Sequence, residues 1–421
     1  MQLSKSLAAL AACAVVFFTT PASAAPGKLG LTVNADGTYA VSVDGAVWLA
    51  SGAGAPQAVV AYNNQLHSTS DGSLKPDAAP EAADGTNYTG FTQTFNGGLL
   101  RVDWQYYEAA NAIIFVQTFP QGLTGMAVNG GNSKDLASAF PVFNFSADAS
   151  KAFLTWPECM CSGATGLWTA SGVKSSGLTD DGGSPLVLFD AAATTVVLSS
   201  FSGFMTANVG TYKATSGNLG AGYNGMLQSV PAGHAHHTLL VAGSGVNDTV
   251  MKFGDMLLAR TGKHRTRPDA DLIISTLGYW TDNGAYYYYN TFPSLSMQQT
   301  ILDVLAYWKT LVLPVMHLMY DSWWYWKECS PGSPNTWLNC RGAMELWEPR
   351  NDVFPDGFKF LEPLPLALHN RWMSGVNNTY IEDLGFASSF IVEKASDFAL
   401  PIKPDVFEYM MGRAKAWGMV L

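Results

Sequence analysis

Charged side chains are scarce in this sequence, and basic residues are scarcer than acidic ones. Asp, Glu, Lys and Arg together make up 13% of the 421 residues, about half the share of an average soluble protein. The 23 Lys and Arg residues against 33 Asp and Glu residues leave a formal net charge of −10. Proteins that bind nucleic acid need a positive surface, so this charge balance argues against nucleic acid as a partner.

The sequence also lacks a clear membrane span. The apolar run from Leu7 to Phe18 is shorter than the roughly 20 residues that a bilayer-crossing helix needs. Lys5 precedes this run, and Ala22-Ser23-Ala24 follows it with the small side chains that a signal peptidase requires. We therefore predict a signal peptide over residues 1–24 and a secreted mature protein with no membrane partner. A retained N-terminal anchor is the alternative.

Cysteine is scarce as well, with five residues, of which Cys13 lies in the predicted signal peptide. Cys329 and Cys340 bracket a short loop rich in Ser and Pro, and a disulfide there could contribute about 3 kcal/mol. Cys159 and Cys161 are too close for an easy mutual bond, so they cross-link elsewhere or are free. Four Asn-X-Ser/Thr sequons are compatible with a glycoprotein. They begin at Asn87, Asn144, Asn247 and Asn377.

Helical periodicity is nearly absent from the first half of the chain. A chain of this length exceeds the size of one typical core, so two domains are expected. Between residues 25 and 262, short alternating strands separated by turn residues predict an antiparallel β-sandwich. The clearest predicted strand pairs are Tyr39–Val43 with Ala46–Leu49, Leu99–Tyr107 with Ala112–Phe119, and Leu186–Phe189 with Thr195–Ser199. Gly52–Asp84 predicts a long surface loop, and Val250–Ala259 predicts a helix.

The only metal-ligand candidates in this half are the histidines of His234-Ala-His236-His237. On a strand, His234 and His236 would share a face and could bind a metal ion. No third ligand is identifiable nearby, so ordinary strand histidines are the favoured interpretation. We predict no metal and no other cofactor.

The pattern changes after a basic linker at residues 263–270. Leu272–Leu277 and the start of Leu313–Glu328 are apolar and predict buried strands of a parallel sheet. Leu364–Leu368 predicts a third strand, and Met419–Leu421 begins a fourth. This alternation of strands and helices predicts that residues 271–421 form about four strands of an incomplete (β/α)8 TIM barrel, which typically needs about 250 residues.

Two helices of this half have recognisable start signals. Ser296 with Gln299 forms a capping box ahead of the helical pattern Met297–Leu311. Asp405 with Glu408 forms a similar pair at the start of a last helix that ends near Trp417. The fold class predicted for the whole chain is therefore multi-domain, β followed by α/β.

Each predicted strand of this half ends in polar or aromatic side chains. Asp282 follows the first strand, Asp321 the second and Asn370 the third. The carboxyl ends of parallel barrel strands meet at one rim, so we expect these side chains to surround one binding site. Consecutive strand residues point to opposite faces, and some tryptophans of the segment Trp323–Trp326 must therefore belong to the core.

Three segments of the barrel portion resemble a known superfamily. They are Leu277–Asn290 (LGYWTDNGAYYYYN), Tyr320–Lys327 (YDSWWYWK) and Trp347–Gly357 (WEPRNDVFPDG). They resemble a branch of the retaining α-glycosidases of the α-glucosidase and raffinose-type α-galactosidase superfamily, TIM-barrel glycoside hydrolases. The resemblance covers the barrel portion well, and the sandwich only by general architecture.

The resemblance implies an oligosaccharide or polysaccharide partner. Asp321 matches the second-strand Asp that hydrogen-bonds sugar hydroxyls, but Ser322 replaces the acid that follows it in the galactosidases. The segment His369-Asn370-Arg371 also departs from the better-known patterns. Indole rings are suited to stacking on sugars. The predicted substrate-binding residues are Trp280, Asp282, Asp321, Trp323, Trp324, Trp326, His369, Asn370 and Arg371.

Retaining hydrolysis needs two carboxyl groups roughly 5–5.5 Å apart. In the superfamily the nucleophilic Asp ends the fourth strand, so we expect the catalytic residues beyond Leu421 and interpret the chain as a truncated copy. Asp282 with Asp321 is the alternative pair, and Glu393 is a further acid candidate. The alternative function is a non-catalytic carbohydrate-binding or interaction protein. The exposed sheet edges of a half barrel would favour self-association.

Overall fold

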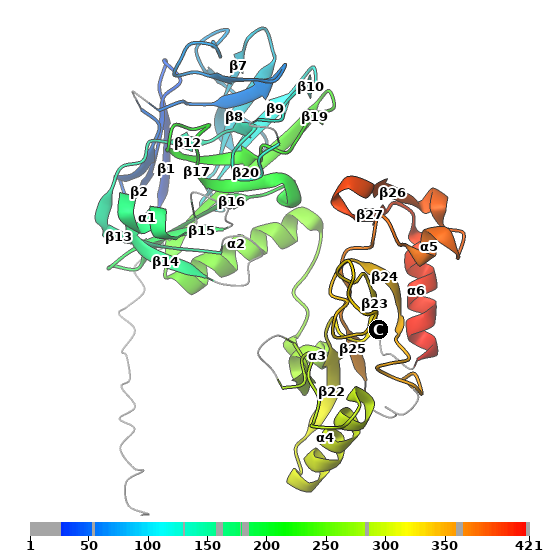
Figure 1. Ribbon diagram of the computed structural model, residues 1–421. Helices are drawn as coiled ribbons and strands as arrows, with labels where there is room; N and C mark the ends of the chain where they lie inside the picture. The colour runs from blue at the N-terminus through cyan, green and yellow to red at the C-terminus, as the bar shows by residue number, and fades with distance from the viewer. Residues whose placement is uncertain are drawn as a thin grey trace, which may run out of the picture. The chain divides into compact units, whose positions relative to one another are not determined.

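The structure is a computed structural model that describes residues 27–52, 55–128, 131–156, 163–176, 178, 185–282, 286–358 and 365–417. The predicted signal peptide, Cys159, Cys161 and the strand expected from Met419 lie outside these ranges. The chain divides into two compact units, Met1–His264 and Arg265–Leu421 (Figure 1). Among the helices of the described ranges, none combines the length and apolar character that a membrane crossing needs.

The N-terminal unit is built on a nine-stranded antiparallel sheet, which confirms the predicted antiparallel β architecture (Figure 1). In spatial order its strands are β14 (Ala164–Trp168), β13 (Asp148–Thr155), β15 (Leu186–Asp190), β16 (Thr194–Ser200), β20 (His234–Ser244), β9 (Ala112–Phe119), β8 (Leu100–Tyr107), β7 (Thr89–Phe95) and β6 (Glu81–Ala82). The predicted pairs β8 with β9 and β15 with β16 are both present.

Smaller antiparallel sheets accompany the large one. They are β1 (Leu29–Val33) with β2 (Tyr39–Val43) and β3 (Ala46–Ala50); β11 (Ser138–Ala139) with β4 (Val59–Tyr62) and β5 (Gln65–Ser68); β12 (Val142–Phe143) with β18 (Leu219–Tyr223) and β17 (Ala207–Thr211); and β10 (Leu123–Thr124) with β19 (Ser229–Val230). The predicted β2–β3 hairpin turns at Asp44 and Gly45, whose φ angles of 50° and 79° are typical of a two-residue hairpin turn.

The prediction of a long surface loop over Gly52–Asp84 is wrong, because part of that segment forms a buried β-sheet. Val59 and Val60 of β4 have no exposed surface. The turn at Asn63 and Asn64, with φ angles of 50° and 60°, folds β4 onto β5. Tyr62 stacks on His67 across this hairpin with ring centroids 4.0 Å apart. Asn tolerates positive φ better than most residues, which is why this pair can turn the chain.

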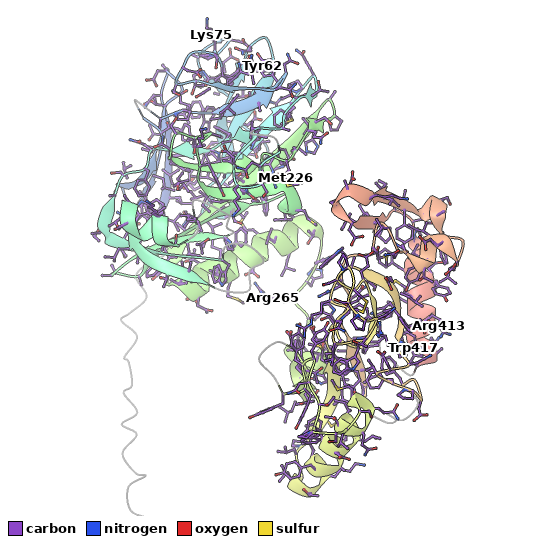
Figure 2. All side chains as sticks on the ribbon, viewed as in Figure 1. Tyr62, Lys75, Met226, Arg265, Arg413 and Trp417 are labelled. Atoms are coloured by element: carbon purple, nitrogen blue, oxygen red, sulfur yellow. A yellow bond between two sulfur atoms is a disulfide. The ribbon has the colours of Figure 1, made fainter. Side chains whose placement is uncertain are left out.

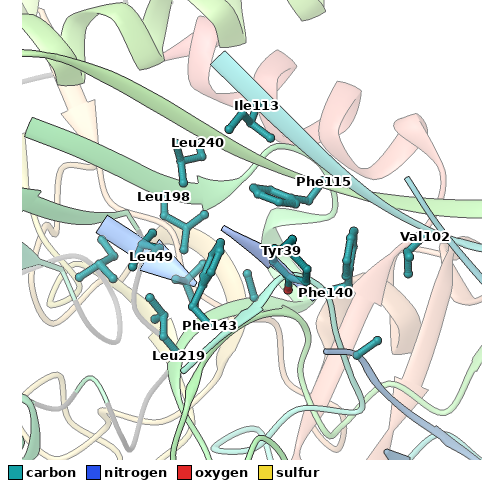
Figure 3. Packing of buried hydrophobic residues seen from close by; sticks show 14 of the residues in the cluster. Tyr39, Leu49, Val102, Ile113, Phe115, Phe140, Phe143, Leu198, Leu219 and Leu240 are labelled. Carbon is teal, nitrogen blue, oxygen red and sulfur yellow. The ribbon is translucent and has the colours of Figure 1, made fainter. Parts of the chain in front are cut away.

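Strand alternation distributes the apolar side chains of the large sheet over two cores. Ile113 and Phe115 of β9 pack in one cluster with residues of the smaller sheets, including Tyr39 and Phe143 (Figure 3). Tyr39 is fully enclosed there, and its hydroxyl donates to Val142 O at 2.8 Å.

The intervening residues of β9 face the other side of the sheet. Ile114 and Val116 pack in a second cluster with α2 (Val246–Thr261), which contributes Phe253. The predicted helix Val250–Ala259 is thus present and extends beyond its predicted ends. A second, shorter helix of this unit is α1 (Ala170–Ser175).

The C-terminal unit contains a three-stranded parallel sheet in the order β21 (Leu277–Trp280), β22 (Val315–Tyr320), β25 (Leu366–Leu368). The helix α4 (Met297–Leu311) connects β21 to β22 with the predicted bounds. Ser296 Oγ accepts a hydrogen bond from Gln299 N at 3.1 Å, as its capping role requires. The remaining elements are β23 (Tyr325–Lys327), β24 (Met344–Pro349), α5 (Thr379–Glu382), β26 (Phe390–Glu393), β27 (Phe398–Pro401) and α6 (Pro404–Ala416).

Two local predictions in this unit are corrected. Leu272–Leu277 is not one buried strand, since Leu272–Ser275 forms the short helix α3 and Ile274 is 72% exposed. Asp271 caps α3 by accepting from the backbone of Ile273 and Ile274.

The last helix begins at Pro404, so Asp405 is not its cap. Asp405 lies in the first turn and accepts from Ser389 Oγ at 2.6 Å. At the other end of α6, the Arg413 guanidinium lies 5.7 Å from the centre of the Trp417 ring and pairs with Glu348 (Figure 2).

Candidate functional site

The carboxyl ends of β21 and β22 lie side by side because the two strands are parallel. Thr281 follows β21, and its backbone N donates to Met319 O of β22 at 3.1 Å. Asp321 follows β22 and is 6% exposed, and its backbone N donates to Thr281 Oγ1 at 3.4 Å. These contacts bring Asp282, the residue after Thr281, next to the end of β22.

His369 joins the same edge from the third strand. Its backbone N donates to Tyr320 O at 2.9 Å, and its Nδ1 lies 2.9 Å from the Tyr325 hydroxyl. Burial lowers the pKa of His369; Asp321 and Asp282 oppose this shift, while Arg371 and Lys327 reinforce it. Four charged side chains therefore act on this imidazole.

The predicted site residues Asp282, Asp321, His369 and Arg371 are thus brought together. Asn370, between His369 and Arg371, is exposed. Trp280 of β21 is 48% exposed. Trp372 was not among the predicted binding residues and is also 48% exposed, directly after Arg371. Its position after a strand-end basic residue is the signal that sequence analysis passed over.

Trp323 and Trp324 do not lie at a rim, contrary to the prediction that they contact saccharide. Both are fully buried, and Trp324 packs against Trp347 with ring centroids 5.4 Å apart. Trp323 Nε1 donates to Thr281 O at 3.2 Å. The chain turns between β22 and β23, so both indoles enter the core and neither surface is available to a ligand.

Trp326 of β23 is only partly buried, but one face of its ring is already occupied. The guanidinium of Arg350 lies 4.3 Å from its centre. Trp326 is therefore placed to hold Arg350, and its contact with a ligand would be limited to the remaining surface.

Lys327 is the main residue that sequence analysis missed. It has no exposed surface, and its Nζ donates to Ser322 O and Tyr289 OH. The ammonium also lies 4.7 Å from the centre of the Tyr289 ring. Burial lowers the pKa of Lys327 to about 7, helped by Arg371, Arg350 and Arg341 and opposed by Asp321. Lys327 lies on the same face of β23 as the buried Tyr325, because residues two apart on a strand share a face.

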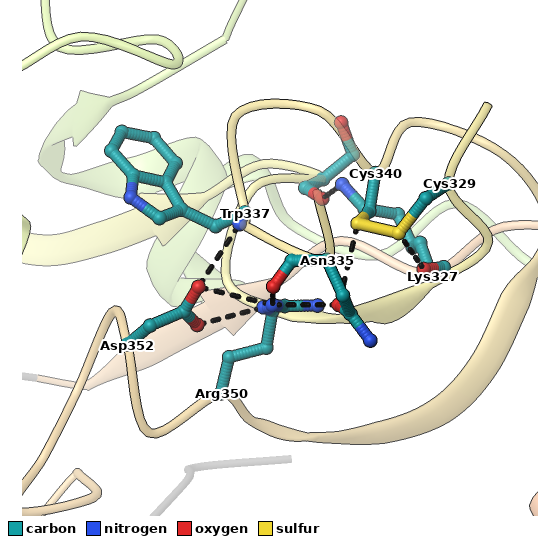
Figure 4. A network of polar contacts seen from close by, with 8 residues as sticks. Lys327, Cys329, Asn335, Trp337, Cys340, Arg350 and Asp352 are labelled. Atoms are coloured by element: carbon teal, nitrogen blue, oxygen red, sulfur yellow. Dashed lines mark hydrogen bonds and ion pairs between the residues drawn. A yellow bond between two sulfur atoms is a disulfide. The ribbon is translucent and has the colours of Figure 1, made fainter. Parts of the chain in front are cut away.

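Beside Lys327, Arg350 and the disulfide loop form a network of polar contacts (Figure 4). Arg350 is 1% exposed, and its Nε and Nη2 donate to the two carboxylate oxygens of Asp352 at 2.8 and 3.0 Å. Nη2 also donates to Asn335 Oδ1 at 3.1 Å. Asn335 belongs to the loop closed by the predicted disulfide Cys329–Cys340, which the structure confirms.

A second carboxyl pair lies where β23 meets the turn before β27. Burial and the neighbouring Asp397 raise the pKa of Glu328. Burial would raise the pKa of Asp397 as well, but hydrogen bonds from Glu328 and from Gly375 N lower it overall. Ser374 Oγ lies 3.0 Å from Asp397 Oδ1 and also contacts Glu328. The acid candidate Glu393 is exposed and accepts from Ala395 N at 3.0 Å.

The histidines of β20 are packed against other side chains of the protein. His236 is fully buried, and its burial lowers its pKa to about 3, so it is neutral at ordinary pH. His234 Nε2 lies 2.5 Å from the Tyr223 hydroxyl. Within the described ranges, no three or more His, Cys, Asp and Glu side chains are arranged to hold a metal ion.

Comparison with known proteins shows that this chain is similar in fold to solved structures. No protein-family model and no curated protein sequence matches this chain. The ligand-free α-N-acetylgalactosaminidase NagBb from Bifidobacterium bifidum has a TM-score of 0.55 at 11% identity, covering 93% of this chain and 68% of that one. Its GalNAc complex gives 0.55 at 10% identity, covering 95% and 68%.

The GH36 α-galactosidase AgaA from Geobacillus stearothermophilus matches more weakly. Its TM-score is 0.40 at 13% identity, and the match covers 77% of this chain and 46% of that one. The likeness to NagBb extends over most of the present chain and is the one that bears on its architecture. The chain therefore shares its fold with the corresponding part of this glycosidase.

Proposed function

We propose that this protein is a glycoside hydrolase-like protein that binds α-linked saccharide at the carboxyl ends of β21, β22 and β25. The observation that carries the proposal is that Asp282, Asp321 and His369 follow three neighbouring parallel strands, with Arg371 two residues after His369. Similarity in fold to NagBb, a protein whose structures include a GalNAc complex, supports an α-linked galactose-type sugar as the first ligand to test.

The assigned roles follow from the chemistry of each group. Asp321 Oδ1 accepts from Ser322 N, and we assign its other oxygen to a sugar hydroxyl. His369, Asn370 and Arg371 would bind further hydroxyls, and the exposed rings of Trp280 and Trp372 would stack on sugar faces. Hydrolysis would need two carboxyl groups, and Asp282 with Asp321 is the pair that adjacent strand ends supply.

Replacing Asp321 by asparagine is expected to weaken saccharide binding about tenfold or more, because a hydrogen bond to a charged group contributes about 1.5–3 kcal/mol. Calorimetry with an α-galactosyl oligosaccharide and with an N-acetyl-α-galactosaminide would measure the change. Asp383→Asn, at the end of α5, is the matched control and should leave affinity unchanged.

A chromogenic α-glycoside assay on the same proteins separates the two forms of the proposal. Turnover that disappears in Asp321→Asn would assign hydrolysis, whereas binding without turnover would assign a non-catalytic carbohydrate-binding protein. Binding of no saccharide by the unaltered chain would overturn the proposed function.

We also propose that the protein passes through a secretory pathway. One disulfide and four exposed sequon asparagines support this proposal, namely Asn87, Asn144, Asn247 and Asn377. Expressed in a eukaryotic secretory host, the protein is expected to lose mass when N-glycans are removed enzymatically. Each single Asn→Gln substitution at an occupied sequon should remove one step of that mass. An unchanged mass after enzymatic treatment would contradict the proposal.

A further inference from the structure

Positive charge accumulates around Lys327 from separate parts of the C-terminal unit. We call Lys327, Arg341, Arg350 and Arg371 the basic cluster. Arg341 and Lys327 both lie over the Tyr289 ring, at 4.3 and 4.7 Å from its centre. Arg371 Nη1 donates to Arg341 O at 2.6 Å, which ties these two residues together. All three guanidinium groups act on the Lys327 ammonium.

Four carboxylates act on the four cations of the basic cluster. Asp352 is engaged by two nitrogens of Arg350, so it serves that cation alone. Asp321, Asp282 and Glu345 are the other carboxylates that act on this region. Holding several cations together with burial of Lys327 and Arg350 costs free energy, and a bound anion would offset that cost.

Hydrogen-bond donors without a partner in the basic cluster also favour a bound anion. Within the described residues, Arg371 Nε and Arg350 Nη1 are buried and have no hydrogen-bond partner. Buried N–H groups are paired in most proteins, and a ligand is one source of the absent partner. Arg371 is held in place by the carbonyls of Arg341 and Gly342, so its guanidinium is oriented in advance.

We propose that the saccharide bound at this site carries an anionic group, held by Arg371 together with Arg341, with the buried Lys327 ammonium adding positive charge behind them. Sulfate esters and uronate carboxylates share the oxygen geometry that a guanidinium binds with two parallel hydrogen bonds. The ring of Trp372, 4.8 Å from the Arg371 guanidinium, would contact the sugar that carries the group. This inference rests on the proposed function, because it specifies the ligand class of the same site.

The test compares three oligosaccharides of equal length by calorimetry at low salt: a neutral galacto-oligosaccharide, a galacturonate oligosaccharide and a sulfated galactan oligosaccharide. At least one anionic ligand should bind about tenfold or more tightly than the neutral one, since two charge-assisted hydrogen bonds are added. This preference should shrink as salt is added. The tighter of the two anionic ligands identifies the group.

Arg371→Gln should weaken binding of the anionic ligand by a larger factor than binding of the neutral sugar, and so remove the preference, because the lost positive charge binds the anionic group. Arg341→Gln, at an exposed side chain, should reduce the same preference and guards against misfolding of the first variant. Arg267→Gln is the matched control, since its partner Asp269 is exposed and lies outside the cluster.

The outcomes separate this inference from the proposed function. Equal or tighter binding of the neutral oligosaccharide would overturn the anionic assignment and leave saccharide binding intact. Binding of none of the three would overturn both. A preference that survives in Arg371→Gln and in Arg341→Gln would remove these residues from the anion site.

Discussion

Replacing Trp324 by alanine is expected to lower the free energy of unfolding of the C-terminal unit by about 3–5 kcal/mol, as for other buried aromatics. Trp324 has no exposed surface. Its ring packs against Tyr325, Trp347, Phe358 and Trp417 with centroids 5.1 to 6.1 Å away. Removing it would leave a cavity among rings that cannot collapse together. Urea denaturation of the full chain, followed by near-ultraviolet circular dichroism, measures this change.

Phenylalanine substitutions provide the matched comparison. Trp324 Nε1 is buried without a hydrogen-bond partner in the described part of the chain, so Trp324→Phe loses part of the packed ring but no hydrogen bond and should cost less than Trp324→Ala. Trp323 Nε1 donates to Thr281, so Trp323→Phe should cost about 1 kcal/mol more than Trp324→Phe. A Trp324→Ala protein of unchanged stability would contradict the assigned packing role.

The buried tryptophans show where sequence analysis reached its limit. The apolar run ending in Asp321 correctly predicted a strand, because β22 forms at Val315–Tyr320 with Leu318 and Tyr320 in the core. Alternation could not be carried past Asp321, since the turn before β23 resets which side chains face inward. The number of rings in the core depends on β24, α6 and Phe358, which are distant in sequence.

Local sequence patterns predicted the structure correctly where a single short-range hydrogen bond determines it. Ser296 caps α4 through its own side chain, so the start of that helix was predictable. Asp271 caps α3 by the same chemistry, but the apolar residues after it matched a strand pattern and hid the cap. In Gly52–Asp84, overall composition hid a four-residue buried strand ending at two asparagines.

The site was predictable only in part for the same reason. Parallel strands bring their carboxyl ends together, so Asp282, Asp321 and His369 could be assigned to one edge. The basic cluster could not be predicted from the sequence. Arg341 and Arg350 reach Lys327 through the pairing of β23 with β24 and through the disulfide loop.

Replacing Lys327 by methionine is expected to stabilise the C-terminal unit most at neutral and acidic pH, by about 1–4 kcal/mol. Burial lowers the pKa of Lys327 from 10.5 to about 7, with Arg371, Arg350 and Arg341 adding to the shift and Asp321 opposing it. Methionine fills similar space without charge, and Ser322 O keeps the hydrogen bond from Tyr289 OH at 3.1 Å.

The sign of the pH dependence follows from proton binding. Between about pH 7 and 10.5 the unfolded chain keeps the lysine proton that the folded chain releases, so the unfolding free energy of the unaltered protein rises with pH. Below about pH 7 both states are protonated and the full cost of the buried charge remains. The advantage of Lys327→Met should therefore be constant below about pH 7 and shrink steadily above it.

Denaturation of both proteins at intervals from about pH 6 to pH 10 measures this difference. Lys309→Met on the exposed face of α4 is the control and should show no such trend. The same Lys327→Met protein should bind the anionic oligosaccharide more weakly, because it loses one cation of the basic cluster. A gain in stability with a loss of anion affinity is the expected signature of a charge retained for binding. A stability difference independent of pH would contradict it.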